Sequence, residues 1–471
     1  MPLKFFNTLS RSVQEFVPLA PEGKKVGMYC CGPTVYDFAH IGNWRTFVFG
    51  DLVRRYLQFK GYDVHHVMNI TDVDDKIIKR VRESKTSLPE FTSKFETAFF
   101  DDLKTLNCLP PTQTPRATEH IAEIISLIEK LMQRGFAYKA TDGSVYFSIE
   151  KYRAWGATYG QLVKLNFDEM RVGERVRSDE YEKEAVADFA LWKTRASDDD
   201  AVAWPSPWGE GRPGWHIECS AMSMKLLGAS FDLHLGGEDL MFPHHEDEIA
   251  QSEGAGLQSP GQHFVKYWLH GAHLLVEGKK MSKSLGNFFT LRDLLAKGFT
   301  GREIRFQLLQ SHYRETFNFT LGGLDSARAS LMRIDECLTK LRELAGDTSA
   351  PADEKLLAQF SSLLDEDLNI AGAWGAIFDW VRDANRRLAE NSLDSASAAS
   401  ALATWNRLDS VLGVGAPLEV EVPAEINALL EARQAARKAK DFKRADVIRD
   451  ELKAKGWIIE DTPKGLRLKR L

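Results

Sequence analysis

Residues 26–70, VGMYCCGPTVYDFAHIGNWRTFVFGDLVRRYLQFKGYDVHHVMNI, decide the fold class. The stretch opens with a short apolar run, residues 26–30, which predicts a buried strand because Gly-Pro-Thr follows it closely. Apolar side chains then recur at mostly helical spacing from Asn43, and Gly61 ends the predicted helix. Residues 63–70 predict a second strand. Strand, helix and strand in this order form a βαβ unit, which indicates an α/β fold with a parallel sheet.

Chemically active side chains follow these predicted strands. Cys31, His40 and Thr71 all fall near the carboxyl ends of the two strands. Ligands of parallel sheets bind at that edge. The sequence therefore places a candidate site there, although Thr71 could equally be the N-cap of a helix over residues 72–80.

The pattern changes along the chain and predicts several structural units. Nearly continuous helical periodicity follows Gly322, and a helix pair with a hairpin makes up the end. The predicted units are a Rossmann-like catalytic domain (1–114 and 205–255), a connective insertion (115–204), a region with a cationic loop (256–321), an α-helical bundle (322–415) and a small α+β module (416–471). The helices expected after Gly322 cover 324–344, 351–366, 370–391, 398–412, 423–440 and 442–456.

Composition is that of an ordinary globular protein: 44% of the 471 residues are hydrophobic and 27% are charged. No apolar run approaches the roughly 20 residues that span a bilayer, and the N-terminus lacks a signal-peptide pattern. Five cysteines form an odd, sparse set, which argues against a disulfide framework. We therefore expect a cytoplasmic protein that has no membrane partner.

Charge is distributed unevenly. The formal net charge is −6, yet residues 431–471 hold thirteen Lys or Arg against seven Asp or Glu. Such a basic terminal module could make local phosphate contacts, and a solvated helix with a frayed tail is the alternative.

Four residues offer the ligands of a tetrahedral zinc site. Cys31 follows the first strand, and Cys219 lies in WHIECS. His244 and Glu248 are four residues apart in a helix expected to begin at Pro243, so they share a face. Two thiolates, an imidazole and a carboxylate suit zinc. Isolated cysteines and histidines are also common core residues, so the spacing leaves that alternative open, and His245 competes with His244.

Two short strings carry groups that suit a nucleotide phosphate. His40-Ile41-Gly42-Asn43 puts donors and a glycine where a strand turns into a helix. Lys280-Met281-Ser282-Lys283-Ser284 is a doubly cationic loop that glycines flank. An enzyme that attacks the α-phosphate of ATP needs both kinds of group. An ordinary surface loop is the alternative for either string alone.

These strings resemble the HIGH and KMSKS signatures of class I aminoacyl-tRNA synthetases. MYCCGPTVYD (28–37), GWHIECSAM (214–222) and DLMFPHHE (239–246) further resemble the zinc-binding motifs of the cysteinyl-tRNA synthetase family of bacterial type. The likeness covers nearly the whole chain. It implies one zinc ion on Cys31, Cys219, His244 and Glu248 that binds the substrate thiolate.

The resemblance also implies ATP-dependent formation of cysteinyl adenylate and transfer of cysteine to tRNA(Cys). His40, Asn43, Lys280 and Lys283 would then act on the phosphates, and Mg²⁺ would accompany ATP. The chain departs from the class pattern at Asn43, where the signature has His, and at Leu235, where the family often has Gly. The full expected ATP set is His40, Gly42, Asn43, Gly237, Asp239, Lys280 and Lys283.

Further roles follow from the same resemblance. Thr71 and Trp215 would line the cysteine pocket, and residues 256–321 would form a KMSKS-bearing stem-contact region. Arg437, Asp446 and Asp461 would read the anticodon, while a solvated helix and hairpin remain the alternative for each. We expect a monomer.

Two rival functions remain at this point. A mycothiol-type ligase would share zinc and adenylation but would acylate an aminosugar. A non-catalytic tRNA- or zinc-binding protein would have lost activity. The long helical and basic region after Gly322 argues against the first, and His40, Lys280 and Lys283 argue against the second.

Overall fold

The computed structural model describes residues 2–163, 188–195, 202–282, 285–416, 423–462 and 465–470. It divides into two compact units, Met1–Gly415 and Ala416–Leu471. Each unit is described by itself. Among the described helices, none combines the length and the apolar character that a membrane crossing requires.

A four-stranded parallel sheet forms the centre of the first unit. Its strand order is β10 (Val265–Gly271), β9 (Phe231–Gly237), β3 (Lys25–Cys30) and β4 (Asp63–Met68). Every pairing in this sheet is parallel. The prediction of an α/β fold around a parallel sheet is therefore confirmed.

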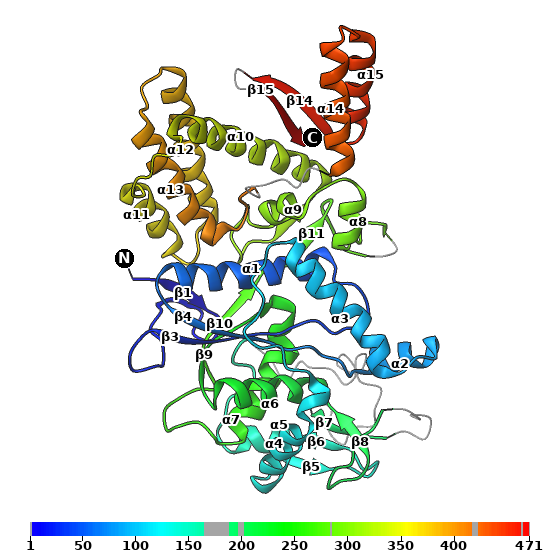
Figure 1. Ribbon diagram of the computed structural model, residues 1–471. Helices are drawn as coiled ribbons and strands as arrows, with labels where there is room; N and C mark the ends of the chain where they lie inside the picture. Colours follow the sequence, from blue (N-terminus) through cyan, green and yellow to red (C-terminus); the bar gives the residue numbers. More distant parts are fainter. Residues whose placement is uncertain are drawn as a thin grey trace. The chain divides into compact units, whose positions relative to one another are not determined.

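Helix α1 (Ile41–Phe59) connects β3 to β4 and lies along one face of the sheet (Figure 1). Apolar side chains on more than one side of the helix are buried, among them Trp44, which stacks on Phe99 of the helix 88–105, and Leu52, which lies near Leu308 and Leu309. The helix begins at Ile41, two residues before the position that the apolar pattern suggested, because His40 caps its first turn.

Two helices follow β4. Helix α2 (Asp75–Ser84) is capped by Asp74, so the alternative role of Thr71 as a helix N-cap is wrong. Helix α3 (Leu88–Thr105) was not foreseen from the sequence, although Ser87, Pro89 and Glu90 form a typical helix start.

The insertion contains an antiparallel sheet in the order β5-β6-β7-β8. Helix α4 packs beside it, and its apolar face shares a hydrophobic cluster with Phe147, Leu191 and Ile217. The elements are α4 (Ile121–Gln133), β5 (Ala137–Lys139), β6 (Val145–Phe147), α5 (Ile149–Ala154), β7 (Phe189–Thr194) and β8 (Gly211–Pro213).

Helices α6 (Trp215–Leu227) and α7 (Glu246–Gly254) contact each other on the sheet face opposite α1 (Figure 1). Helix α7 begins at Glu246 rather than at Pro243. A short turn over Met241–His245, with a kink at Phe242, precedes it.

A small sheet in the order β12-β11-β13 carries the cationic loop. Its strands are β11 (Leu274–Val276), β12 (Lys279–Lys280) and β13 (Phe317–Phe319), and α8 (Leu291–Ala296) and α9 (Gly301–Leu308) lie between them in sequence. The bundle follows with α10 (Leu321–Ala345), α11 (Glu354–Leu364), α12 (Ile370–Ala389) and α13 (Ser395–Leu412), close to the predicted helices.

A buried ion pair ties α1 to α9. Arg305 is fully buried and donates to the Asp51 carboxylate at 2.5 Å, and to the Leu412 carbonyl at the end of α13. Asp51 also accepts from Arg55 at 2.8 Å. The network therefore joins the sheet-covering helix to the bundle, and only a paired charge is tolerated at such depth.

The second unit is a helix pair with a hairpin, as the sequence suggests. It contains α14 (Ala424–Lys438), α15 (Phe442–Ala454), β14 (Trp457–Thr462) and β15 (Gly465–Arg470). A small core of its own is built from Ile426, Ile448, Leu452 and Trp457. An N-terminal hairpin in the first unit, β1 (Lys4–Asn7) and β2 (Ser12–Glu15), completes the strands of the described residues.

Candidate metal centre and nucleotide site

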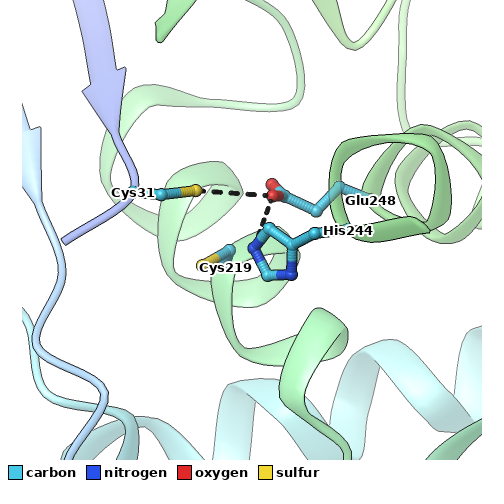
Figure 2. Close-up of side chains that lie close together, drawn as sticks. All are labelled: Cys31, Cys219, His244 and Glu248. Carbon is cyan, nitrogen blue, oxygen red and sulfur yellow. Dashed lines mark hydrogen bonds and ion pairs between the residues drawn. The ribbon is translucent and has the colours of Figure 1, made fainter. Parts of the chain in front are cut away.

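Four side chains from three separate segments converge at the carboxyl edge of the central sheet. Cys31 follows β3, Cys219 lies in α6, and His244 and Glu248 come from the turn before α7 and from α7 itself (Figure 2). One ligand atom of each lies within 4.8 Å of those of the other three. The structure thus brings together the four residues that the sequence suggested.

Local geometry fixes the position of Cys31. A Cβ on the next residue, Gly32, would lie 1.6 Å from the backbone oxygen of Asn69, so only glycine fits there. The Gly32 amide also donates to the Asn69 side-chain oxygen at 2.9 Å. The chain after β3 is therefore held against the loop after β4, and the Cys31 side chain faces the α6–α7 side.

The spacing of the four ligand atoms suits a small divalent ion. His244 Nε2 lies 3.1 Å from Glu248 Oε1, and Cys31 Sγ lies 3.8 Å from the same oxygen. Ligand atoms of a tetrahedral zinc site are separated by about 3.3–3.8 Å. His244 and Glu248 meet as residues i and i+4 even though α7 begins only at Glu246.

The two thiols are electrostatically unequal. A hydrogen bond from Cys31 lowers the pKa of Cys219 to about 6, and the nearby His244 adds to that effect. Burial, together with the neighbouring Cys219 sulfur, raises the pKa of Cys31 well above its ordinary value. Without an ion, Cys219 is therefore the more acidic of the two thiols.

Glu248 is held ionised in this buried place. Burial alone would raise its pKa, but His234 and His244 both bond to the carboxylate and lower that pKa to about 2. Burial would lower the pKa of His244, but Cys219 and Glu248 raise it to about 10. The site thus contains negative charge that a cation can neutralise.

A second possible ligand set shares two residues with the first. Cys31, Glu248, His234 and His245 also have ligand atoms within 4.8 Å of one another. His245 Nε2 lies 3.3 Å from Cys31 Sγ, and His234 Nε2 lies 3.0 Å from Glu248 Oε2. His245 therefore lies close to the site, in keeping with its place in the sequence analysis as the alternative ligand to His244.

A chain of histidines extends outward from these ligands. His244 Nδ1 and His216 Nδ1 are 2.8 Å apart, and His216 Nε2 lies 3.4 Å from Asp247 Oδ2. On the other side, His245 Nδ1 lies 2.7 Å from His270 Nε2. None of these outer contacts was foreseen. The only available signal was a histidine at a position where the pattern predicts burial.

Trp215 lies beside the candidate ligand His244, and Thr71 lies beside the loop that follows Cys31. The Trp215 ring stands 4.4 Å from the His244 ring between centroids, and Trp215 is 38% exposed, so one side of it is open. Thr71 is buried, and its hydroxyl accepts from the Asn69 side chain at 3.1 Å. Its backbone pairs with Thr34, on the loop that follows Cys31.

The His40 string forms the start of α1. His40 Nδ1 accepts from the Asn43 amide at 3.2 Å, while Asn43 Oδ1 accepts from the His40 amide at 3.1 Å. This reciprocal cap uses the oxygen of the Asn43 side chain and leaves its NH₂ group as the donor. Gly42 lies beside them, at a helix N-terminus that is suited to an anion.

The two nucleotide strings are adjacent although about 240 residues separate them in sequence. A Cβ on Gly42 would lie 3.2 Å from the Met281 methyl carbon. The Ile41 amide donates to the Phe289 carbonyl at 2.9 Å. Lys280 is exposed at the end of β12, and Lys283 lies outside the described residues.

The expected ribose-binding residues lie just after β9. Gly237 is buried at the end of the strand, and Asp239 is exposed in the short turn Glu238–Leu240. A Cβ on Gly237 would lie 2.3 Å from Asp239 Oδ1, so the Asp239 carboxylate folds back over Gly237. Leu235 is buried in the main hydrophobic core.

Comparison with known proteins identifies the family. Residues 17–329 match the model of the tRNA synthetases class I (C) catalytic domain. A cysteine–tRNA ligase of Chlamydia muridarum is 45% identical over 486 residues, which cover 100% of both chains. This chain belongs to the cysteine–tRNA ligase family. It is an enzyme of the class I aminoacyl-tRNA synthetases, as the sequence predicted.

Other comparisons agree with this family. The cysteine–tRNA ligase of Chlamydia caviae is 46% identical and covers 100% of this chain and 98% of the relative. Residues 359–416 match the DALR domain, and residues 419–467 match the cysteinyl-tRNA ligase anticodon binding domain. The family match thus continues to the end of the chain.

Solved structures of other class I enzymes share the fold. Methionyl-tRNA synthetase of Mycobacterium tuberculosis, in complex with methionyl-adenylate, has a TM-score of 0.58 at 15% identity and covers 83% of this chain and 90% of its own. The ternary LeuRS–tRNA–LeuAMS complex of Agrobacterium radiobacter has a TM-score of 0.62 at 12% identity and covers 85% of each chain. At this low identity the likeness concerns the fold alone.

The expected anticodon readers of this ligase lie in the second unit. Arg437 is near the end of α14, and Asp446 lies in α15. Asp446 is 63% exposed and pairs with Arg449 at 3.0 Å. Asp461 is in β14, and its side chain lies outside the described residues. Their role in reading tRNA stays a prediction.

Proposed function

We propose that this cysteine–tRNA ligase activates L-cysteine with ATP and transfers it to the 3′-terminal ribose of tRNA(Cys), and that zinc on Cys31, Cys219, His244 and Glu248 selects the substrate thiolate. The observation that carries the proposal is the convergence of these four buried ligands, each within 4.8 Å of the others.

The chemistry of the donor set supports zinc. Two sulfurs, one imidazole and one carboxylate favour a borderline-soft ion over Mg²⁺ or Ca²⁺. The first set is preferred to the set with His234 and His245, because it supplies two thiolates rather than one. A zinc ion bound there would hold the cysteine sulfur as thiolate and would bind a serine hydroxyl far less well.

Residues around the four ligands fix where their protons sit and how their side chains are oriented. A metal on His244 Nε2 requires the proton on Nδ1, which can donate to His216; His216 can in turn donate to Asp247. His234 holds the second oxygen of Glu248 and so orients the first. His216, His234 and Asp247 therefore act on the ligands without being ligands themselves.

Selectivity against serine needs this help because the two substrates differ by one atom. A pocket that relies on shape discriminates such small differences only weakly. We assign the walls of the pocket to Trp215, whose ring contacts His244, and to Thr71, whose loop adjoins the loop after Cys31.

The adenylation step is assigned to the two adjacent strings. The cysteine carboxylate oxygen attacks the α-phosphate, and the bond to pyrophosphate breaks. His40, the NH₂ group of Asn43, Lys280 and Lys283 stabilise charge on the phosphates, most strongly in the transition state. Mg²⁺ accompanies ATP. The backbones at Gly42 and Gly237 approach the nucleoside, and Asp239 accepts from a ribose hydroxyl.

In the second step the tRNA ribose hydroxyl attacks the acyl carbon, and AMP leaves. Arg437, Asp446 and Asp461 read the anticodon in this proposal, and the five units of the sequence analysis are its domains. The match of the last unit to an anticodon binding domain argues against the aminosugar ligase as a rival. We further propose a cytoplasmic monomer.

The test combines metal analysis with amino-acid-dependent pyrophosphate exchange. We expect about one zinc per chain, exchange with cysteine, and little exchange with serine. The control is the Cys337→Ser variant, whose sulfur is buried in the bundle. Zinc-free protein that still discriminates cysteine from serine would refute the role of the metal, and absence of any exchange would refute the activity.

A further inference from the structure

The cationic loop is secured by a side chain that neither nucleotide string contains. Asn287 is only 8% exposed and lies just after the loop. Its Oδ1 accepts from the Ser282 amide at 2.8 Å. Its Nδ2 donates to the Lys280 carbonyl at 3.2 Å and to the Val276 carbonyl at 3.1 Å. One buried amide thus holds both the start of the loop and the strand before it.

These contacts use the full hydrogen-bonding geometry of the amide. Both protons of Nδ2 and one lone pair of Oδ1 are engaged with backbone groups. Aspartate would keep the acceptor but would set an oxygen against two carbonyl oxygens. Alanine would leave all three backbone groups without this partner, and buried groups without partners are costly. Asparagine is therefore specifically suited to this position.

The residues directly after Asn287 hold the other nucleotide string. The Phe289 carbonyl accepts from the Ile41 amide at 2.9 Å. Thr290 pairs with His40 as an isolated antiparallel bridge, and the Phe288 ring lies 5.2 Å from the His40 ring between centroids. Four consecutive residues, 287–290, thus contact the cationic loop at one end and the start of α1 at the other.

We infer that Asn287 is a positioning residue for adenylation: through segment 287–290 it sets the place of Lys280 relative to His40. This inference rests on the proposed function, because it assumes that Lys280 and His40 act on one ATP molecule. Asn287 itself contacts backbone only, and it acts through the groups that it holds. Its effect is on the alignment of the phosphates rather than on the binding of cysteine.

The test compares Asn287→Ala and Asn287→Asp with the wild-type enzyme in cysteine-dependent pyrophosphate exchange. Misplacement of reacting groups by about 1 Å can cost on the order of 100-fold in rate. We therefore expect kcat to fall about 10- to 100-fold in both variants. KM for cysteine should stay within about twofold, and zinc content should be unchanged, because the metal ligands lie on other elements.

Asn318 supplies a matched control on β13 of the same small sheet. It is exposed, and its Oδ1 accepts from the Gly278 amide at 2.7 Å, at the turn between β11 and β12. Asn318→Ala removes a similar side-chain bond without touching the loop beyond Lys280. Its kcat should stay within about twofold of the wild-type value.

The outcomes separate this inference from the proposed function. If the wild-type enzyme shows no cysteine-dependent pyrophosphate exchange, the proposed function itself is refuted. An active wild type with unchanged kcat in both Asn287 variants would overturn only the positioning role. So would a loss of zinc and cysteine affinity parallel to the loss of kcat, because that pattern marks general disruption. If Asn287→Ala does not fold, the kcat of the isosteric Asn287→Asp variant alone tests the positioning role.

Discussion

Replacing His216 by phenylalanine should weaken metal binding although His216 is not a ligand. In the metal-free protein the pKa of His244 is raised to about 10, so both ring nitrogens carry protons at pH 7, and Glu248 accepts from Nε2 at 3.1 Å. A metal on Nε2 displaces that proton, and the Nδ1 proton, with His216 as its acceptor at 2.8 Å, is then the one that orients the ring. His216→Phe keeps a ring of similar size but removes that acceptor.

The size of the effect follows from the buried donor that is left behind. A buried polar group without a partner costs about 1–3 kcal/mol. Because the metal-free imidazolium carries the same Nδ1 proton, part of this cost falls on both states. Loss of the hydrogen-bond partner of a metal-binding histidine typically weakens metal binding about 10- to 100-fold, and we expect zinc binding by His216→Phe to weaken within that range. His216→Asn, which places an amide oxygen near the former Nδ1, should restore part of the affinity.

The assay is zinc competition against a chromogenic chelator at pH 7, with thermal unfolding of the metal-free proteins alongside. His66→Phe is the matched control, because His66 is buried and neither ring nitrogen has a hydrogen-bond partner among the described residues. Its zinc affinity should change less than twofold. Equal losses in His216→Phe and His66→Phe, or no loss in His216→Phe, would refute the reasoning.

Three further perturbations test other parts of the molecule. Cys219→Ser should reduce zinc retention and cysteine activation far more than ATP binding in equilibrium titrations, whereas equal loss of all three would indicate a purely structural metal. Lys280→Ala should lower the adenylation rate at least tenfold with little change in cysteine affinity, and Lys279→Ala should not, as measured by pre-steady-state pyrophosphate release. Asp51→Asn should cost about 3–5 kcal/mol of unfolding free energy at pH 7, because it leaves the buried Arg305 charge unpaired. Burial alone would raise the pKa of Asp51, but Arg305 and Arg55 outweigh it and hold that pKa below its ordinary value of about 3.9. The stabilisation is thus complete above that value and is lost as the pH falls through the lower folded pKa, so denaturant titrations of wild type and Asp51→Asn should converge only at strongly acidic pH.

Much of the fold could be predicted because its signals are local. The strand before Cys31 and the helices of the bundle follow from hydrophobic periodicity, and their ends moved by only a few residues. The start of α7 moved by a similar amount, from Pro243 to Glu246, because a kinked turn takes up the residues between. Helix α3 was missed although its capping residues were visible, since no strand pattern drew attention to that stretch.

The four candidate ligands could be named because cysteine, histidine and glutamate are typical zinc ligands and because the resemblance to the family implied this set; only His244 and Glu248 are close in sequence. The hydrogen-bond partners of these ligands could not be found from the sequence. His216, His234 and His270 each stand alone in sequence, and only the packing of α6, α7 and the sheet shows which atom each one faces. The role of Asn287 was not predicted for the same reason, because its three hydrogen-bond partners are backbone atoms, which carry no sequence signal.

The charges of the site explain why such partners are needed at all. A deeply buried Glu248 with a pKa of about 2 and a Cys219 thiolate with a pKa of about 6 would be costly without compensation. In the metal-free protein the positive charge is a proton on His244, whose pKa is raised to about 10. A divalent ion can take over that compensation only if the proton leaves Nε2 and the Cys31 thiol gives up its own. The outer histidines fix where the remaining protons sit, so they decide how readily the exchange occurs. The selectivity proposed for sulfur therefore depends on hydrogen bonds that lie beyond the four ligands.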